Sequence, residues 1–546
     1  MNVQRSPFLS GHAVEESWRW VALILFSAYF AIGLASYADY GMSTDEVIQR
    51  HHGLVSLKYI LSLLNIDATG AFAYMERIPD LATYPHRSYG VVFHLPLLLI
   101  EHFIRDRVPM NVLWQVRHLY TFCWFFVGAI YFYRLARFWF SSPVAMVATL
   151  LLVTSPRIYA DSFYNVKDTT FLAFFNIALY YGVSFMKRDD HVGALKFALS
   201  VAVMLNVRFF GLFLPAFVGG LMLIQVFRQP LVQWLSAAKP LLTLTASCVI
   251  FTWMIWPAAW AHPLKFFTDT FIISTNYDRF TGFVPYMGVR HRGSELPWHY
   301  IPHWILISTP LHHLLLLAIS LVGLPWIWKS TRVTTMRMPT VLLLMVLLVP
   351  PALAILFKST LNINWRHFYF LQAPLALLAP LSLQFLLEER IGDVRLAAVK
   401  TAGMIVLLAS TLGGVVYQVG WLYRNHPHQQ VFFNRLGIDR AQTDFQLDGW
   451  NLSARHGIEY IASIDSRSPI YVNSIRVEAQ LFLVDDDIRN RLRFSRYPEN
   501  ADYIVDTNHW SRTHPPATGK WEDVYQLRVD GVVIMRIWKK VAEATP

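Results

Sequence analysis

Long apolar runs separated by short polar segments make up most of the chain. A helix needs about 20 apolar residues to cross the ~30 Å hydrocarbon core of a bilayer, and most of these runs approach that length. The pattern therefore predicts an all-α polytopic membrane protein with about eleven transmembrane helices. The predicted spans are 20–38, 115–133, 143–159, 169–186, 193–208, 209–226, 240–257, 301–326, 339–357, 368–387 and 401–421.

One further apolar segment, Gly90 to Ile104, is short for a span, and its placement decides the sidedness of everything that follows. If this segment does not cross the membrane, the short basic loops that follow the spans all lie on the same side of the membrane as the N-terminus. Lysine and arginine accumulate in cytoplasmic loops, so we place this segment on the outer surface. The N-terminus is then inside, and the loop 39–114, with its juxtamembrane helices, is outside.

The tail 422–546 differs from the rest because short apolar runs alternate with turn residues. Runs such as 470–472, 503–505 and 532–535 are typical of strands. We expect a small extracytoplasmic α/β domain here, after a transmembrane catalytic domain over 1–421.

Composition supports a membrane protein and excludes several other classes. The 546 residues are 55% hydrophobic and only 15% charged, below the ~25% of soluble domains. The net charge of +11 reflects the basic loops, and no basic run with interleaved aromatics indicates nucleic-acid binding. Cys123 and Cys248 both lie in apolar spans, and no Cys/His spacing indicates a metal.

Polar residues cluster on the predicted outer face. Asp45 and Glu46 follow the first span, and carboxylates this close to a bundle are usually functional. The other clusters are 84–87, 155–168 and 358–367. Arg208 lies in an apolar hairpin, where a cation needs an anionic partner.

This combination suits the transfer of a sugar from a lipid phosphate. A carboxylate can take the proton from an acceptor hydroxyl, which general-base catalysis accelerates about 10²- to 10⁴-fold. The departing phosphate needs charge stabilisation, which arginine and lysine supply.

The same residues resemble the GT-C glycosyltransferases, and within them glycosyltransferase family 39, which includes protein O-mannosyltransferases and the aminoarabinose transferase acting on lipid A. The resemblance covers the membrane part and depends on an ordered set of features. These are the acidic pair after the first span, the basic residue before a short apolar stretch, the Asp that opens the fourth span and the charge between the fifth and sixth. The segments 162–168, 365–370, 426–434 and 445–453 are similar to a bacterial branch of unassigned substrate.

The resemblance implies roles for particular residues. Asp45 matches the acidic residue that acts on the acceptor, and Asp168 matches the acid opening the fourth span. With Glu46 they are the candidate catalytic residues. The candidate donor-phosphate ligands are His86, Arg87, Lys167, Arg208, Arg366 and His367. The chain departs from the family in having Pro-His-Arg-Ser-Tyr near His86 and Arg in place of Lys at 208.

Each of these residues also has a structural interpretation. Asp45 could be a solvated loop carboxylate, Glu46 could orient the loop, and Asp168 could cap a helix. Lys167, Arg366 and His367 could mark the membrane boundary. We expect a solvated face for His51–His52, and core or interface roles for His299 and His303 rather than half of a metal site.

We therefore expect an inverting glycosyltransferase in the bacterial inner membrane, its site facing the periplasm, with Asp45 as general base. Its partners would be a polyprenyl-phosphate sugar donor, membrane lipid and an extracytoplasmic acceptor; no cofactor is expected and a divalent metal is not indicated. The alternatives are a transporter or lipid-linked-sugar flippase, or a scaffold that presents the tail. Transporters tend to show inverted repeats, and no such symmetry is evident in the sequence.

Overall fold

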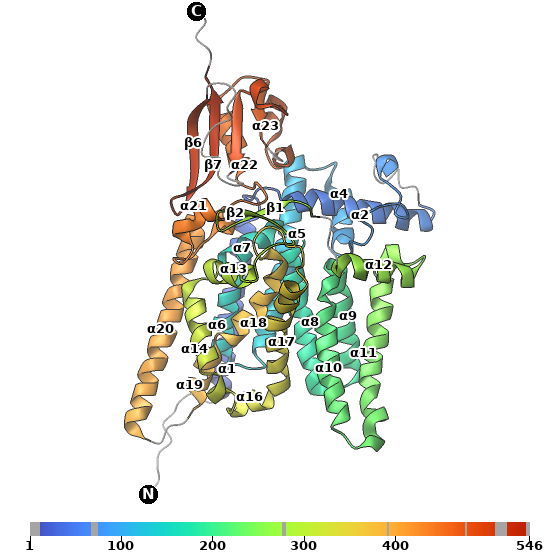
Figure 1. Ribbon diagram of the computed structural model, residues 1–546, viewed down its shortest axis with the longest axis vertical. Helices are drawn as coiled ribbons and strands as arrows, with labels where there is room; N and C mark the ends of the chain where they lie inside the picture. The colour runs from blue at the N-terminus through green and yellow to red at the C-terminus, as the bar shows by residue number, and fades with distance from the viewer. Residues whose placement is uncertain are drawn as a thin grey trace, which may run out of the picture.

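The computed structural model describes residues 11–66, 75–275, 280–389, 393–474, 478–507 and 521–541. Most helices run side by side in one bundle (Figure 1). A small sheet domain stands at one end of the bundle, and a few short helices lie across that same end (Figure 1).

Eight helical segments in the described part of the chain are long and apolar enough to cross a membrane. Two bent helix pairs raise the number to as many as ten. The eight are α1 (Gly11–Ser36), α5 (Met110–Ala136), α8 (Asp168–Arg188), α10 (Phe213–Phe227), α11 (Trp234–Met254), α17 (Arg337–Leu356), α18–α19 (Gln372–Leu378 and Leu381–Glu388) and α20 (Val394–Arg424).

These segments account for ten of the eleven predicted spans. The remaining one, 193–208, is α9 (His191–Val207), an apolar helix of 17 residues, somewhat short of the ~20 that a span needs. It packs against α8 and α11, as a bundle helix would. The predicted fold class is confirmed, with α9 as the segment that separates ten spans from eleven.

Both bent pairs break at a proline. α6 (Ser142–Val153) and α7 (Pro156–Tyr164) meet at 66°, and α13 (Tyr300–Ser308) and α14 (Leu311–Val322) meet at 120°. Proline disfavours helical backbone at the residue before it, so Pro156 and Pro310 end one helix and begin the next. The breaks lie toward the end of the bundle that bears the sheet domain (Figure 1).

Two helices of the predicted outer loop lie across that end of the bundle (Figure 1): α2 (Thr44–Leu63) and α4 (His94–Ile104). Buried Glu101 on α4 pairs with Arg50 on α2 and with Arg117 on α5, whose Nη1 is 3.2 Å from Glu101 Oε2. The short segment 94–104 thus lies on the bundle end, as the charge pattern predicts; which side of a membrane it faces stays a prediction.

The long loop after α11 contains structure that the sequence analysis did not anticipate. It begins with α12 (Pro263–Thr275) and continues into a hairpin of β1 (Phe283–Tyr286) and β2 (Val289–Arg292). Met287 and Gly288 in the turn have φ of 51° and 76°, the left-handed pair typical of a tight two-residue hairpin. Short helices α15 (Leu324–Ile327) and α16 (Thr331–Thr335) follow α14.

The tail forms a five-stranded sheet in the order β4-β3-β5-β7-β6. β3 is parallel to β4 and β5, whereas β7 is antiparallel to β5 and β6. The strands are β3 (Ile470–Asn473), β4 (Leu492–Phe494), β5 (Tyr503–Thr507), β6 (Trp521–Val529) and β7 (Val532–Lys540), accompanied by α21 (Ala441–Asp444), α22 (Ala454–Ile464) and α23 (Asp486–Arg491). The predicted α/β character is confirmed, and three of the strands are the predicted runs.

Two hydrophobic cores meet between Leu452 and Ala454. The bundle core extends through residues after α20, including Phe432, Phe445 and Leu452. The core of the sheet domain begins at Ala454. By its packing, the segment between α20 and α22 therefore belongs to the bundle. The predicted domain boundary between residues 421 and 422 stays a prediction.

Candidate functional site

A charged cluster lies where the starts of α2, α8 and the η5 turn (Arg366–Leu371) meet. Arg366 Nη1 is 2.9 Å from Asp45 Oδ2 and 3.5 Å from Asp168 Oδ2. The side chain of Asp168 is fully buried and that of Asp45 is 17% exposed. One guanidinium therefore joins the two predicted carboxylates, which come from distant parts of the chain.

Asp45 is held by the cap of α2. Ser43 precedes the helix, and its backbone N–H donates to Glu46 Oε2 at 2.7 Å, which is half of a capping box. The Ser43 hydroxyl donates to the carbonyl of Tyr164 at 2.8 Å, so the start of α2 is tied to the end of α7. Asp45 thereby occupies the first turn of α2, where the helix dipole favours a negative charge.

Asn165 organises the start of α8. Its side-chain oxygen accepts the backbone N–H of Asp168 at 2.7 Å, while its amide nitrogen donates to Asp161 Oδ2 at 3.1 Å and to Asp168 Oδ2 at 3.2 Å. Asp161 also accepts the hydroxyl of Tyr164 at 2.7 Å. The amide thus fixes two buried carboxylates against each other.

Arg366 is positioned from two sides. Its backbone N–H donates to Asn364 Oδ1 at 2.7 Å, and its guanidinium lies 4.8 Å from the centre of the Trp450 ring. A cation over an aromatic face is stabilised by the ring quadrupole, the more so when water is excluded. The Trp450 ring comes from the segment between α20 and α22, which therefore helps to build the cluster.

Three more predicted donor ligands lie close to these charges. Arg208 ends α9 and forms an ion pair with Asp168. Lys167 Nζ lies 4.4 Å from the centre of the Tyr89 ring and interacts electrostatically with Asp45 and Asp168. His367 is within electrostatic reach of Arg208, Arg366 and Lys167. The structure brings these residues together.

Asp45 and Lys167 lie outside the bundle helices, and the pKa of each is lowered, for different reasons. Burial raises the pKa of Asp45, but the charges of Arg366, Lys167 and Arg208 and the hydrogen bond from Arg366 outweigh it, so the pKa lies below 3.8. Burial lowers the pKa of Lys167 below 10.5, although Asp45 opposes this. Asp45 is therefore an anion throughout the physiological range.

Two predicted donor ligands lie at the edge of this region. Arg87 is exposed and donates to the carbonyl of Ala82, and exposed His86 places its ring 5.7 Å from that of His52. The structure does not bring Arg87 into the ion pairs of Arg366. The predicted solvated face is wrong for His52, which is 3% exposed and stacks on Tyr89 at 4.9 Å. Burial lowers the pKa of His52 to about 3.

Glu46 has the contacts of a structural residue. Its side chain is fully buried, one oxygen caps α2, and the other lies 3.0 Å from His118 Nε2 on α5. These contacts favour the loop-orienting role that the sequence left open, and a catalytic role for Glu46 stays a prediction.

The sequence analysis missed Asn165, Asp161, Tyr89 and Trp450 as members of this region. Asp161 and Asn165 lie in the polar run 155–168, which the sequence analysis had already identified as a cluster. The hydrogen bond between their side chains follows from the break before α7. Trp450 lies in a segment assigned to the tail. Nothing local indicates that it meets a residue 84 positions earlier.

The two histidines considered as half of a metal site have another partner. The Nδ1 atoms of His299 and His303 both lie 2.8 Å from the hydroxyl of Tyr286. Within the described residues, no group of three or more His, Cys, Asp or Glu side chains is placed to hold a metal. Whether the chain uses a metal stays a prediction.

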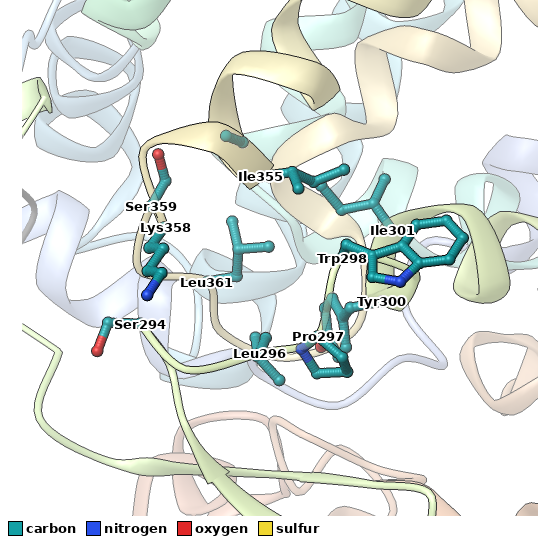
Figure 2. A pocket seen from close by; sticks show the side chains of 11 residues that line it. Ser294, Leu296, Pro297, Trp298, Tyr300, Ile301, Ile355, Lys358, Ser359 and Leu361 are labelled. Atoms are coloured by element: carbon teal, nitrogen blue, oxygen red, sulfur yellow. The ribbon is translucent and has the colours of Figure 1, made fainter.

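A small pocket near this hairpin is separate from the charged cluster. Figure 2 shows Trp298 and Leu361 among its lining residues, with Lys358 and Ser359 at the side. Its volume of about 20 Å³ suits one water molecule rather than a sugar.

The fold and the cluster together define a polytopic membrane protein with a buried site of paired carboxylates and cations at one end of the bundle. Residues 106–256 match the family model described as dolichyl-phosphate-mannose-protein mannosyltransferase, which confirms the predicted resemblance over that region. No curated protein matches the chain. Among solved structures, the crystal structure of ArnT from Cupriavidus metallidurans bound to undecaprenyl phosphate has a TM-score of 0.46 and 14% identity, covering 97% of this chain and 99% of that one.

Proposed function

We propose that the protein is a membrane glycosyltransferase that moves a sugar from a polyprenyl phosphate to an extracytoplasmic acceptor. The observation that supports this most directly is the position of Arg366, whose Nη1 atom lies within ion-pairing distance of both Asp45 and Asp168. The match of 106–256 to a family named for dolichyl-phosphate-mannose, a polyprenyl-phosphate donor, agrees with it.

In the proposed reaction, the acceptor oxygen attacks the anomeric carbon from the face opposite the phosphate. The new carbon–oxygen bond forms as the bond to the phosphate oxygen breaks, and the electron pair leaves with the polyprenyl phosphate. The acceptor proton passes to Asp45. The anomeric configuration is inverted because a single displacement occurs.

The low pKa of Asp45 fits a late proton transfer. A free hydroxyl is a far weaker acid than a carboxylic acid, so Asp45 would not deprotonate it in advance. As the oxygen bonds to the anomeric carbon it becomes strongly acidic, and even a weak base then suffices. The charge on Asp45 also orients the hydroxyl beforehand by accepting its hydrogen bond.

The cations would stabilise the phosphate. Arg366, Arg208 and Lys167 converge on the two carboxylates, and each can donate to phosphate oxygens. In the proposal Asp168 holds Arg208 and Arg366 in place rather than reacting itself. This division of roles follows from burial, since Asp168 is enclosed and Asp45 is partly exposed.

The test uses the full chain in membrane vesicles with labelled polyprenyl-phosphate sugars. Asp45→Asn should lower transfer about 10²- to 10⁴-fold at unchanged protein level. Mass spectrometry of envelope glycans and glycolipids, with and without the gene, identifies the sugar and the acceptor. Full activity of Asp45→Asn would exclude it as the base.

A lipid-linked-sugar flippase is the second candidate, because the two broken spans are a feature of transporters. The breaks nevertheless lie toward one end of the bundle, whereas transporter sites lie near the midplane. Reconstituted protein that moves a labelled polyprenyl-phosphate sugar between leaflets, with no transfer to any envelope fraction, would favour the flippase.

A further inference from the structure

A groove of about 700 Å³ lies between α14 and α20, and none of its lining residues belongs to the charged cluster. The two helices are neighbours in the bundle (Figure 1). At Gly414 they approach so closely that an added Cβ would lie 2.4 Å from the His312 side chain. At Gly413, one position earlier, an added Cβ would meet nothing within 4 Å. Both glycines line the groove, one at the helix contact and one facing open space.

The groove opens to the membrane side of the bundle. α20 is among the helices able to cross a membrane, and only 17% of its apolar window is buried. Tyr417 and Leu311 at the groove edges are 60% and 42% exposed, whereas Trp421 and Phe432 inside are buried. An apolar chain in the bilayer could pass directly along α20 into this space.

The opposite end of the groove is polar, with Arg435 and Asp530 in its lining. Arg435 lines it, is exposed and follows the end of α20. The nearest anion in the lining, Asp530, already accepts the Trp421 indole N–H at 2.6 Å. The side chain of Asn434 is committed to the carbonyls of Leu306 and Thr309, both at 2.7 Å. Arg435 is thus the charge in this lining available to an outside anion.

A buried donor lies between the two ends. Gln418 is 2% exposed, lines the groove, and its Nε2 atom has no hydrogen-bond partner among the described residues. Leaving a buried amide unpaired destabilises a fold, so such a group normally has a partner. The ester carbonyl of a glycerolipid is an acceptor without a proton of its own and suits this amide.

We propose that the groove is a binding site for one anionic phospholipid, separate from the charged cluster. The phosphate pairs with Arg435, an ester carbonyl accepts from Gln418, and an acyl chain lies along α20. The bound lipid would join α14 and α20 to the β6–β7 turn that carries Asp530, and so stabilise the seat of the sheet domain. The groove recognises the lipid by the charge of its phosphate at one end and by the length of its acyl chain at the other.

Native mass spectrometry of the full chain tests this. The protein is purified, delipidated and offered phosphatidylglycerol or phosphatidylcholine in otherwise identical mixed micelles. The wild type should retain one phosphatidylglycerol, and phosphatidylcholine about tenfold less. Arg435→Gln should remove that preference, whereas Arg424→Gln, an exposed arginine at the end of the same helix but outside the lining, should keep it.

Gly413→Trp should fill the groove and abolish retention of the lipid. Gly403→Trp is its matched control, because Gly403 is on the same helix, an added Cβ there also meets nothing within 4 Å, and it does not line the groove. Gly413→Leu provides a smaller filling variant in case the Trp variant does not fold. Three results would each overturn the proposal. They are equal retention of lipid by the wild type and the Gly413 variants, equal retention of the two headgroups by the wild type, and no lipid in the wild type because another protein occupies the groove.

Discussion

Asp45 and Arg366 lie 321 positions apart and meet at 2.9 Å. The contact joins the first turn of a helix that lies across the end of the bundle to the loop before the penultimate span. The same guanidinium also faces Asp168 at 3.5 Å. A donor phosphate would compete with both carboxylates for it.

Removing Arg366 should therefore lower the transfer rate more than removing a surface charge would. Arg366→Gln deletes one directed donor to the phosphate, and loss of such a donor typically lowers the rate about 10²- to 10³-fold. Arg366→Lys keeps the charge but not the planar fork, so its activity should fall between the two. Transfer rates in vesicles, normalised to protein level, check the order; equal rates for the Gln variant and the wild type would contradict it.

Arg366→Gln should also change the pH dependence of transfer. Arg366 is the largest of the influences that lower the pKa of Asp45 against the raising effect of burial. Without it the pKa of Asp45 rises, and a larger share of the carboxylate is protonated as the pH falls. The residual transfer by Arg366→Gln should decline as the pH falls, and from a higher pH than in the wild type, in which the cations hold the pKa of Asp45 low. A flat profile in the Gln variant would contradict this assignment.

Lys167 should set a basic limb. Burial lowers its pKa below 10.5, so it loses its proton at a lower pH than an ordinary lysine. If its charge assists the phosphate, transfer by the wild type falls as the pH rises toward that pKa. Lys167→Arg should move the fall to higher pH, because a guanidinium keeps its proton above pH 12. Superimposable profiles from pH 7 to 10 would remove Lys167 from the site.

Glu46 should matter for stability rather than for transfer. Glu46→Ala removes the acceptor for the Ser43 N–H, and loss of such a cap typically costs about 1 kcal/mol. Glu46→Gln keeps an acceptor in the same place and should restore most of that stability. Thermal unfolding and specific activity are compared for both variants. A Gln variant that is stable yet inactive would instead make Glu46 catalytic.

The architecture was predictable because apolar runs of this length have few alternatives. Hydropathy located ten of the spans, and the basic loops predicted that 90–104 does not cross, which agrees with its position on the bundle end. The hairpin of β1 and β2 escaped notice because β2 reads Val-Arg-His-Arg, is mostly exposed and so has no apolar run.

The carboxylates of the site could be predicted from the sequence, but the residues that contact them could be predicted only in part. Asp45, Asp168, Lys167 and Arg208 stand out as charges beside apolar runs, and they do come together. The contact of Arg366 with Trp450 depends on how the segment after α20 folds back, and no periodicity encodes that. His52 was misread because a histidine pair looks polar, whereas α2 turns it toward Tyr89.

The way in which α2, α8, α9 and η5 each contribute one charge has a consequence for biosynthesis. The ribosome delivers Asp45 first and Arg366 more than three hundred residues later. Until then Lys167 and Arg208 are the cations of the cluster that face the two acids. A nascent chain stalled before the final helices would therefore hold Asp45 and Asp168 without the guanidinium that joins them, so the cluster is completed only when synthesis is nearly finished.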